Sequence, residues 1–110
     1  MSEATTARPG RADLQIHTAH GDGMGDAAAI FAQIESMGTL NVVAVTDHDD
    51  IEGALLAREV HARGSYSFDF VPGIEVTTRQ GHLLGLWVDE PLRSFRSLEE
   101  TVAAIHEQGG

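Results

Sequence analysis

The sequence contains neither cysteine nor lysine. Without cysteine the chain can form no disulfide bond and no thiolate metal site. Its seven basic residues are all arginine, and 17 acidic residues outnumber them, which gives a formal net charge of −10. A net charge of this sign repels phosphate-bearing ligands and predicts no basic patch for nucleic acid. It leaves a metal-dependent phosphatase open, because bound divalent cations would reverse the local field where acidic residues cluster.

Long hydrophobic runs are also missing. No apolar run approaches the roughly 20 residues that a membrane span needs, and the first 11 residues lack the apolar stretch of a secretory signal. We therefore expect no membrane partner, a cytoplasmic location and a flexible leader over residues 1–11. The length of 110 residues, 42% of them hydrophobic, fits one globular domain at most.

Apolar segments rich in β-forming residues alternate with three helix-like segments. Strands are predicted over residues 12–18, 41–46, 68–78 and 82–88, the third of them interrupted by Pro72-Gly73. Local signals bound the helices. Asp26 is a good N-cap for the first helix and Gly38 ends it, the second ends near Gly64, and Ser97 with Glu100 forms a capping box for the third.

The resulting order, β-α-β-α-β-β-α, predicts an α/β layered or barrel fold. The segment 41–46 (NVVAVT) is apolar without interruption, as in a parallel strand that is buried on both faces. The chain stops where the next strand should begin. We therefore interpret residues 12–110 as the N-terminal, truncated portion of a larger domain.

Polar residues recur where the predicted strands end. Asp13, Gln15 and His17 alternate with apolar residues and should share one side of the first strand. Asp22 lies in the following glycine loop, the run 47–50 (DHDD) directly follows the second strand, and Glu75 and His82 come later. Because the carboxyl ends of strands in α/β folds converge on one face, imidazole and carboxylate groups should meet there. Such a set suits Zn, Mn or Fe.

A less specific interpretation exists for each residue alone. A single histidine near a strand end is usually a satisfied polar residue, and an aspartate before a helix is usually an N-cap, which we expect of Asp49 or Asp50. His20, His61 and His106 fall outside the pattern, and His61 and His106, which lie in predicted helices, are interpreted as surface or packing residues. The metal-site hypothesis depends on the recurrence of ligand types in step with the strand order.

Five segments taken in order resemble the PHP (polymerase and histidinol phosphatase) family. They are DLQIHTAHGDG, VVAVTDHDDIEGA, VPGIEVTT, GHLLGLWVDEP and ETVAAIHEQGG, and they span nearly all of residues 11–110. The resemblance implies a distorted (β/α)7 barrel with up to three divalent metal ions at one mouth. It also implies hydrolysis of phosphoesters such as histidinol phosphate, nucleoside bisphosphates, and the ends of DNA or RNA.

The resemblance also assigns roles, position by position. His17 matches a ligand of the first metal and His82 a ligand of the second, while the catalytic Glu75 matches the carboxylate that bridges these two ions. Asp22 and His48 match ligands of the third metal. Asp13 and Asp47 would support metal ligands without contacting the ion. Apart from the resemblance, Arg79 lies four residues beyond Glu75 and could bind phosphate, although an exposed charge at a strand edge is the preferred interpretation.

Two departures from the family pattern limit these expectations. Gln15 stands where the family has the first histidine of an HxH pair, and a neutral amide oxygen is a weaker ligand for Zn or Mn than imidazole. The family's later ligands, a His-Pro segment, a later His or Cys and a final Asp-x-His, would all lie beyond Gly110. Each metal would then lack ligands, so little activity is expected from residues 1–110 alone.

The sequence thus predicts a metal-dependent phosphoesterase acting on a small phosphomonoester, a nucleotide or an oligonucleotide. Three alternatives stay open. The chain could be a catalytically impaired PHP-like domain with a structural or regulatory role, as Gln15 would permit. It could be an amidohydrolase-like metal-binding barrel, or a small module that binds a basic partner through its acidic surface.

Overall fold

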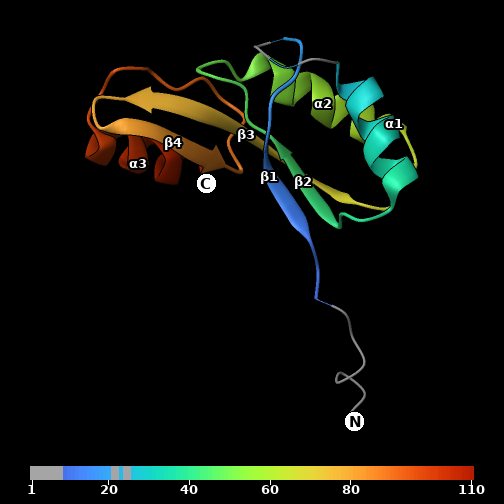
Figure 1. Ribbon diagram of the computed structural model, residues 1–110. Coiled ribbons are helices and arrows are strands. Elements are labelled where there is room, and N and C mark those ends of the chain that lie inside the picture. Colours follow the sequence, from blue (N-terminus) through green and yellow to red (C-terminus); the bar gives the residue numbers. More distant parts are fainter. Residues whose placement is uncertain (1–8, 21–22, 24–25) are drawn as a thin grey trace.

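The structure is a computed structural model, and it describes residues 9–20, 23 and 26–110. It has a mixed α/β fold with the predicted order of elements (Figure 1). The elements are β1 (Ala12–Ile16), α1 (Ala27–Met37), β2 (Val42–Val45), α2 (Glu52–Arg63), β3 (Asp69–Thr78), β4 (Gly81–Leu86) and α3 (Leu98–Glu107). Within the described part of the chain, no helix is long and apolar enough to cross a membrane.

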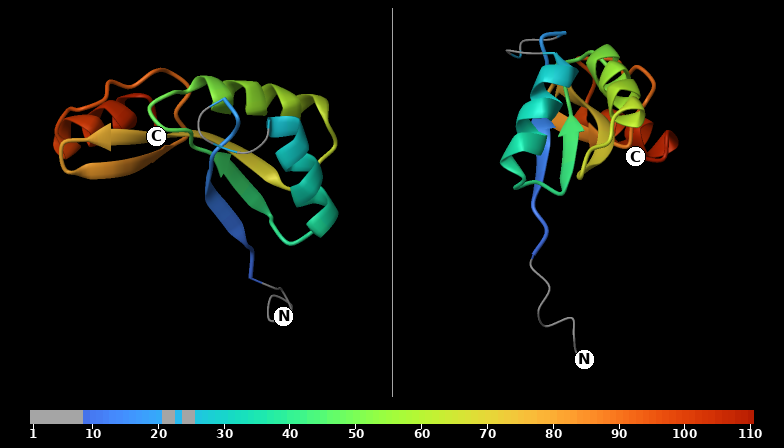
Figure 2. Two further views of the ribbon diagram at one scale, coloured as in Figure 1. Left: turned by 45° about the horizontal axis from the view of Figure 1, so that its top comes forward. Right: turned by 90° about the vertical axis from the view of Figure 1, so that its right-hand side faces the viewer.

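The four strands form one curled sheet in the order β1-β2-β3-β4, as in part of a β/α barrel. β1, β2 and β3 are parallel, whereas β3 and β4 form an antiparallel hairpin. Helices α1 and α2 lie beside the parallel strands and α3 packs along the hairpin (Figure 1). The left view of Figure 2 shows that the hairpin extends away from β1 and β2.

The core lies between the parallel strands and the first two helices. Phe31 of α1 is completely buried and packs edge-on against Phe68, with ring centroids 5.3 Å apart. Val43, Ala44 and Val45 of β2 are also completely buried. Because successive side chains of a strand point to opposite faces, this confirms the prediction of a strand covered on both faces. This core fixes β2 and β3 side by side, and the polar residues that follow β2 therefore start from a rigid position.

The local signals at the helix ends are confirmed. Asp26 Oδ1 accepts a hydrogen bond from the Ala29 amide at 2.9 Å, and Gly38 ends α1 in the left-handed conformation at φ 64°. Ser97 and Glu100 form the predicted capping box of α3. Strand ends differ from the predictions by one or two residues, which is the usual uncertainty at the ends of an element.

The predicted interruption at Pro72-Gly73 is wrong, because β3 runs through both residues. The pair instead marks the point where β3 changes its partner. Its ladder with β2 ends at the pair Val45–Pro72, and its ladder with β4 begins at Gly73–Leu86. A Cβ atom on Gly73 would lie 2.6 Å from the Gly85 carbonyl oxygen, so glycine is required by the close approach of the two backbones.

Candidate metal centre

Glu75 is the residue around which the candidate site is built. It lies in the middle of β3 and is only 4% exposed. The segment after β2 continues along the edge of β3, because the Glu75 amide donates to the Asp47 carbonyl at 3.0 Å and the Asp49 amide donates to the Glu75 carbonyl at 2.9 Å. These two bonds make His48 the direct neighbour of Glu75.

Four side chains from three other segments meet the Glu75 carboxylate. Gln15 Nε2 donates to Oε1 at 2.8 Å, and His17 Nε2 lies 2.9 Å from the same oxygen. On the other oxygen, Oε2, the nearest nitrogens are Nδ1 of His82 at 3.0 Å and Nδ1 of His48 at 3.7 Å. The side chains around the carboxylate thus form two groups. Gln15 and His17 approach Oε1, whereas His82 and His48 approach Oε2.

The geometry of this cluster suits a divalent cation. His17, His48 and Glu75 each offer one ligand atom, and these atoms all lie within 4.8 Å of one another. The imidazole rings are also close, with centroids 4.5 Å apart for His17 and His48 and 5.2 Å apart for His48 and His82. Mixed imidazole and carboxylate donors are the ligands that Zn, Mn and Fe accept in proteins. The cluster could therefore hold a metal ion.

The charge of Glu75 follows from two opposed effects. Burial by itself raises the pKa of Glu75, because it removes water from the carboxylate. Hydrogen bonds from Gln15 and His17 and positive charge on His48 outweigh that effect, and the pKa lies below its ordinary value. Glu75 is therefore an anion at neutral pH, which is the state that a metal ligand requires.

Asp47 holds the end of β1 in place through hydrogen bonds from Thr18. It is completely buried, and its Oδ1 and Oδ2 accept hydrogen bonds from the Thr18 amide and hydroxyl, both at 2.6 Å. Thr18 directly follows His17, so the two bonds fix the backbone that carries the His17 imidazole. A Cβ atom on Gly53 of α2 would overlap Asp47 Oδ2, and the absence of a side chain there makes room for the carboxylate.

Asp49 has a role that the sequence did not reveal. Asp50 behaves like an N-cap, since its Oδ1 accepts from the Glu52 amide at 2.9 Å, but Asp49 does not contact α2 in this way. Asp49 has a φ of 53°, and its carboxylate accepts hydrogen bonds from Thr77 of β3 and Ser94 of the loop before α3. Its partners are 28 and 45 residues away in the chain, and no local pattern announces them.

The other predicted site residues divide into three groups. Gln15 and His82 lie at the cluster, as described above. Asp13 is exposed on β1 and accepts from the Gln15 amide at 3.2 Å, and Arg79 lies on the turn after β3, where its Nε donates to the Phe95 carbonyl at 3.2 Å. Neither is brought to the cluster. Asp22 falls outside the described residues.

Histidines outside the predicted pattern occupy other places. His61 packs among aromatic rings of the core and lies 2.7 Å from the Phe68 carbonyl oxygen, which agrees with a packing role. His20 lies near Asp50 at 3.9 Å, and His106 is exposed on α3.

The chain is similar to known proteins at 30–31% sequence identity. No protein-family model matches the chain. The uncharacterized protein MJ1587 of Methanocaldococcus jannaschii is 31% identical over 111 residues, which cover 91% of this chain and 63% of that protein. The 5'-3' exoribonucleases Rnm of Escherichia coli and Salmonella typhimurium are 31% and 30% identical over 81 residues, which cover 70% of this chain and 27% of each enzyme. The chain thus spans less than two thirds of the length of these relatives.

Proposed function

We propose that the chain is the N-terminal part of a PHP-type domain that hydrolyses phosphoesters with the help of divalent metal ions. The observation that supports this most strongly is the buried Glu75 carboxylate with three imidazoles around it. Packing alone does not explain why polar residues from β1, the loop after β2, β3 and β4 meet here. A buried carboxylate costs free energy unless charge or hydrogen bonds compensate it.

His17, His48 and Glu75 would hold the cation, since their ligand atoms lie within 4.8 Å of one another, and His82, 3.0 Å from Glu75 Oε2, could add a further donor. When bound, divalent cations supply Lewis-acid chemistry, since they activate water and neutralise charge on phosphoryl oxygens. Asp47 would keep the His17 ligand in place through Thr18. We propose Mn, Zn or Fe as the bound cations, because these metals accept mixed imidazole and carboxylate ligands.

The similarity to an exoribonuclease supports phosphoester bonds as the target. An exoribonuclease acts on RNA, whose linkages are phosphodiesters, and the 81 matched residues cover 70% of this chain. We extend the proposal to a nucleotide, an oligonucleotide or a small phosphomonoester as substrate, and to a cytoplasmic location. The remaining ligands of the family's three metals would come from a C-terminal portion of the domain.

A second candidate function follows from Gln15. Its amide donates to Glu75 Oε1, the same oxygen that His17 approaches, and so it already satisfies part of the bonding capacity that a cation would use. The domain could therefore be catalytically impaired and serve a structural or regulatory role. An amidohydrolase-like barrel is a third candidate, and it predicts cleavage of amides in place of phosphoesters.

Calorimetric titration of Mn²⁺ and Zn²⁺ into chelator-treated protein tests the metal centre. We expect binding by the unmodified chain and at least about a tenfold loss of affinity in Glu75→Gln. Glu59→Gln removes an equal charge from an exposed position on α2 and should bind as the unmodified chain does. Equal affinity in both variants would refute the proposed centre.

Activity assays then separate the candidates. A panel of phosphomonoesters, nucleotides and oligonucleotides is compared with a panel of amides, each with metal and with excess chelator. Chelator-sensitive cleavage of phosphoesters supports the proposal, and chelator-sensitive cleavage of amides supports the amidohydrolase-like alternative. Metal binding without cleavage of either panel by a form extended at the C-terminus would favour the impaired domain.

A further inference from the structure

The edge of β3 is covered in succession by three segments. β2 pairs with it up to Pro72, the loop that carries His48 follows at Glu75, and the segment 95–96 comes next. The Phe95 amide donates to the Thr77 carbonyl, and the Arg79 amide donates to the Arg96 carbonyl, both at 2.8 Å. The loop before α3 is therefore held directly beside the candidate metal centre.

This arrangement gathers positive charge in an acidic protein. Three of the chain's seven arginines, Arg79, Arg93 and Arg96, come together with Phe95 on the turn after β3 and on the loop before α3. We call these four residues the arginine rim. The net charge of −10 predicted no basic patch. The proximity of these arginines could not be predicted, because they are separated along the chain.

The rim presents its charges and its aromatic ring to solvent. Phe95 is 70% exposed and has a φ of 62°, a conformation that places a large apolar residue outward at a cost in backbone strain. Arg79 and Arg93 are exposed, and no carboxylate of the described residues lies within 4.0 Å of either guanidinium. Arg96 pairs with Glu100 at 3.1 Å. Arg93 is thus the most open of the three charges, because Arg79 also donates its Nε to the Phe95 carbonyl and interacts electrostatically with Glu100. Glu100 and the neighbouring Glu99 oppose an anionic ligand.

The rim is connected to the metal centre by short contacts. Ser94, between Arg93 and Phe95, donates its hydroxyl to Asp49 Oδ1 at 2.7 Å, and Asp49 directly follows His48. Thr77, which accepts from the Phe95 amide, lies two residues after Glu75 on β3. The rim and the cluster are therefore neighbours along the same edge of β3.

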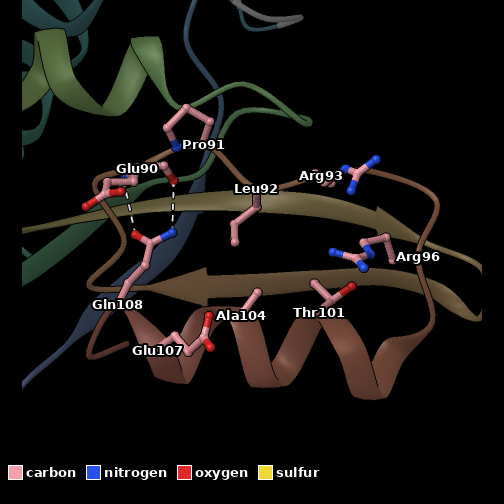
Figure 3. A pocket seen from close by; sticks show the side chains of 9 residues that line it. All are labelled: Glu90, Pro91, Leu92, Arg93, Arg96, Thr101, Ala104, Glu107 and Gln108. Carbon is pink, nitrogen blue, oxygen red and sulfur yellow. Dashed lines mark hydrogen bonds between the residues drawn. The ribbon is translucent and has the colours of Figure 1, made fainter.

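A pocket of about 380 Å³ lies between this loop and α3 (Figure 3). Arg93 and Arg96 are at one end of the view, whereas Glu90, Glu107 and Gln108 are at the other, where Gln108 hydrogen-bonds the Glu90 backbone. The acidic end opposes an anionic ligand, so phosphates would be accepted only at the arginine end. Arg93 and Arg96 at that end belong to the rim.

We infer that the arginine rim is a binding surface for single-stranded nucleic acid beside the proposed metal centre. This inference does not depend on the proposed hydrolysis, because the surface is formed by the rim alone. Arginine recognises phosphate groups through its planar fork of donors. An exposed aromatic ring beside arginines offers a base a surface for stacking, which is how many proteins hold single strands without regard to sequence.

The aromatic ring selects among phosphate-bearing partners. A phosphopeptide or a small phosphomonoester would be satisfied by the guanidinium groups and has no use for an exposed phenyl ring. A duplex keeps its bases stacked inside and could not use the ring either. A strand whose phosphates follow the arginines and whose base covers Phe95 uses all four residues of the rim.

The acidic remainder of the chain weakens this binding without cancelling it. Screening limits the reach of exposed charges to about 8 Å at physiological ionic strength, so the charges of the rim dominate close to it. The net charge of −10 nevertheless disfavours approach from a distance. We expect a weak, strongly salt-dependent complex.

The test uses fluorescence anisotropy with a 5′-phosphorylated, 3′-labelled eight-nucleotide single-stranded RNA. EDTA in the buffer prevents metal binding and cleavage. The double variant Arg93→Gln/Arg96→Gln should bind the RNA at least about tenfold more weakly and lower the slope of log affinity against log salt by about 1.4, from about 0.7 for each lost phosphate contact. The control Arg11→Gln/Arg63→Gln removes the same charge from exposed positions elsewhere. Equal loss in both double variants would overturn the inference, because only net charge would then matter.

Variants of Phe95 test the stacking separately. Phe95→Leu should weaken binding about fivefold or more, and Phe95→Tyr, which keeps a ring, should retain it. Circular dichroism of both variants checks that the loop remains folded. Equal binding by Phe95→Leu and the unmodified chain, or equal affinity for a phosphopeptide of the same charge, would overturn single-stranded nucleic acid as the partner.

The outcomes also separate this inference from the proposed function. If the calorimetric titrations show no metal binding but RNA binding depends on the rim, the proposed hydrolysis fails and the nucleic-acid surface stands. If metal binds at Glu75 and phosphoesters are cleaved, but RNA binding ignores the rim variants, the inference fails alone.

Discussion

Asp49 and Thr77 are joined by two hydrogen bonds, one from the Thr77 amide to Oδ1 at 2.7 Å and one from the Thr77 hydroxyl to Oδ2 at 2.6 Å. Ser94 donates a third to Oδ1. The carboxylate thus connects the loop after β2, strand β3 and the loop before α3. His48 directly precedes Asp49, so its position depends on these bonds.

We predict that Asp49→Ala destabilises the chain by about 1–2 kcal/mol, because three hydrogen bonds to a charged but partly solvated acceptor are lost. It should also weaken Mn²⁺ binding, since His48 would no longer be held beside Glu75. Thermal unfolding and calorimetric titration measure the two effects. Asp50→Ala is the matched control, because the Asp50 carboxylate accepts from the Glu52 amide at the start of α2, whereas Thr77 and Ser94 donate to Asp49. An unchanged metal affinity in Asp49→Ala would show that His48 is positioned by the backbone bonds alone.

The same carboxylate predicts how stability changes with pH. Burial raises the pKa of Asp49, but hydrogen bonds from Thr77 and Ser94 and the charge of His48 outweigh it, and the pKa lies below the ordinary value of 3.8. The unfolded chain therefore binds the proton more readily than the folded one. The stabilisation is complete well above pH 3.8 and is lost as the pH falls through the folded pKa. Urea unfolding between pH 5 and pH 2.5 should show a steeper loss in the unmodified chain than in Asp49→Asn, and parallel curves would contradict the assignment.

Asp47 and Gly53 provide a separate test of how the end of β1 is held. Because a methyl group at position 53 would overlap the Asp47 carboxylate, Gly53→Ala should displace it from Thr18 and lower the free energy of unfolding by about 1–3 kcal/mol. Ala62→Gly, an exposed exchange on the same helix, should cost at most about 1 kcal/mol. Urea unfolding compares the two. A stabilised Gly53→Ala would mean that the helix shifts freely and that Asp47 is not confined by it.

Features set by neighbouring residues could be predicted from the sequence. Asp26, Gly38 and the Ser97–Glu100 box lie within a few residues of the helix ends that they determine, and all are confirmed. The alternation along β1 correctly brought Gln15 and His17 to one side, where both now meet Glu75.

Features set by distant pairings could not be predicted in this way. Pro72-Gly73 has the local signature of a turn, but two ladders on opposite edges keep it extended, and nothing nearby in the chain announces them. The bond between Asp49 and Ser94 joins residues 45 positions apart. The arginine rim was missed for the same reason, since Arg79 reaches the loop at 95–96 only after the hairpin has formed.

Gln15 is the residue at which the chain departs most clearly from the family that it resembles, and replacing it gives the most direct test of what the departure costs. Gln15→His exchanges a neutral amide, which now donates to Glu75 Oε1, for an imidazole that can donate a lone pair to a cation. We predict that Mn²⁺ affinity rises by about tenfold or more, comparable to what one supporting partner contributes at known metal sites. Calorimetric titration gives the affinity and the stoichiometry.

Gln15→Leu completes this experiment as a control. Leucine removes the hydrogen bond to Glu75 without supplying a ligand, and a gain in this variant would mean that the Gln15 amide only obstructs the site. A gain confined to histidine would mean that the first metal position lacks a ligand in the natural sequence. No gain in Gln15→His together with a loss in Gln15→Leu would identify Gln15 as a competent ligand through its carbonyl oxygen, since rotation of the amide would present that oxygen to the cation beside His17. Unchanged affinity in both variants would mean that Gln15 is irrelevant to metal binding.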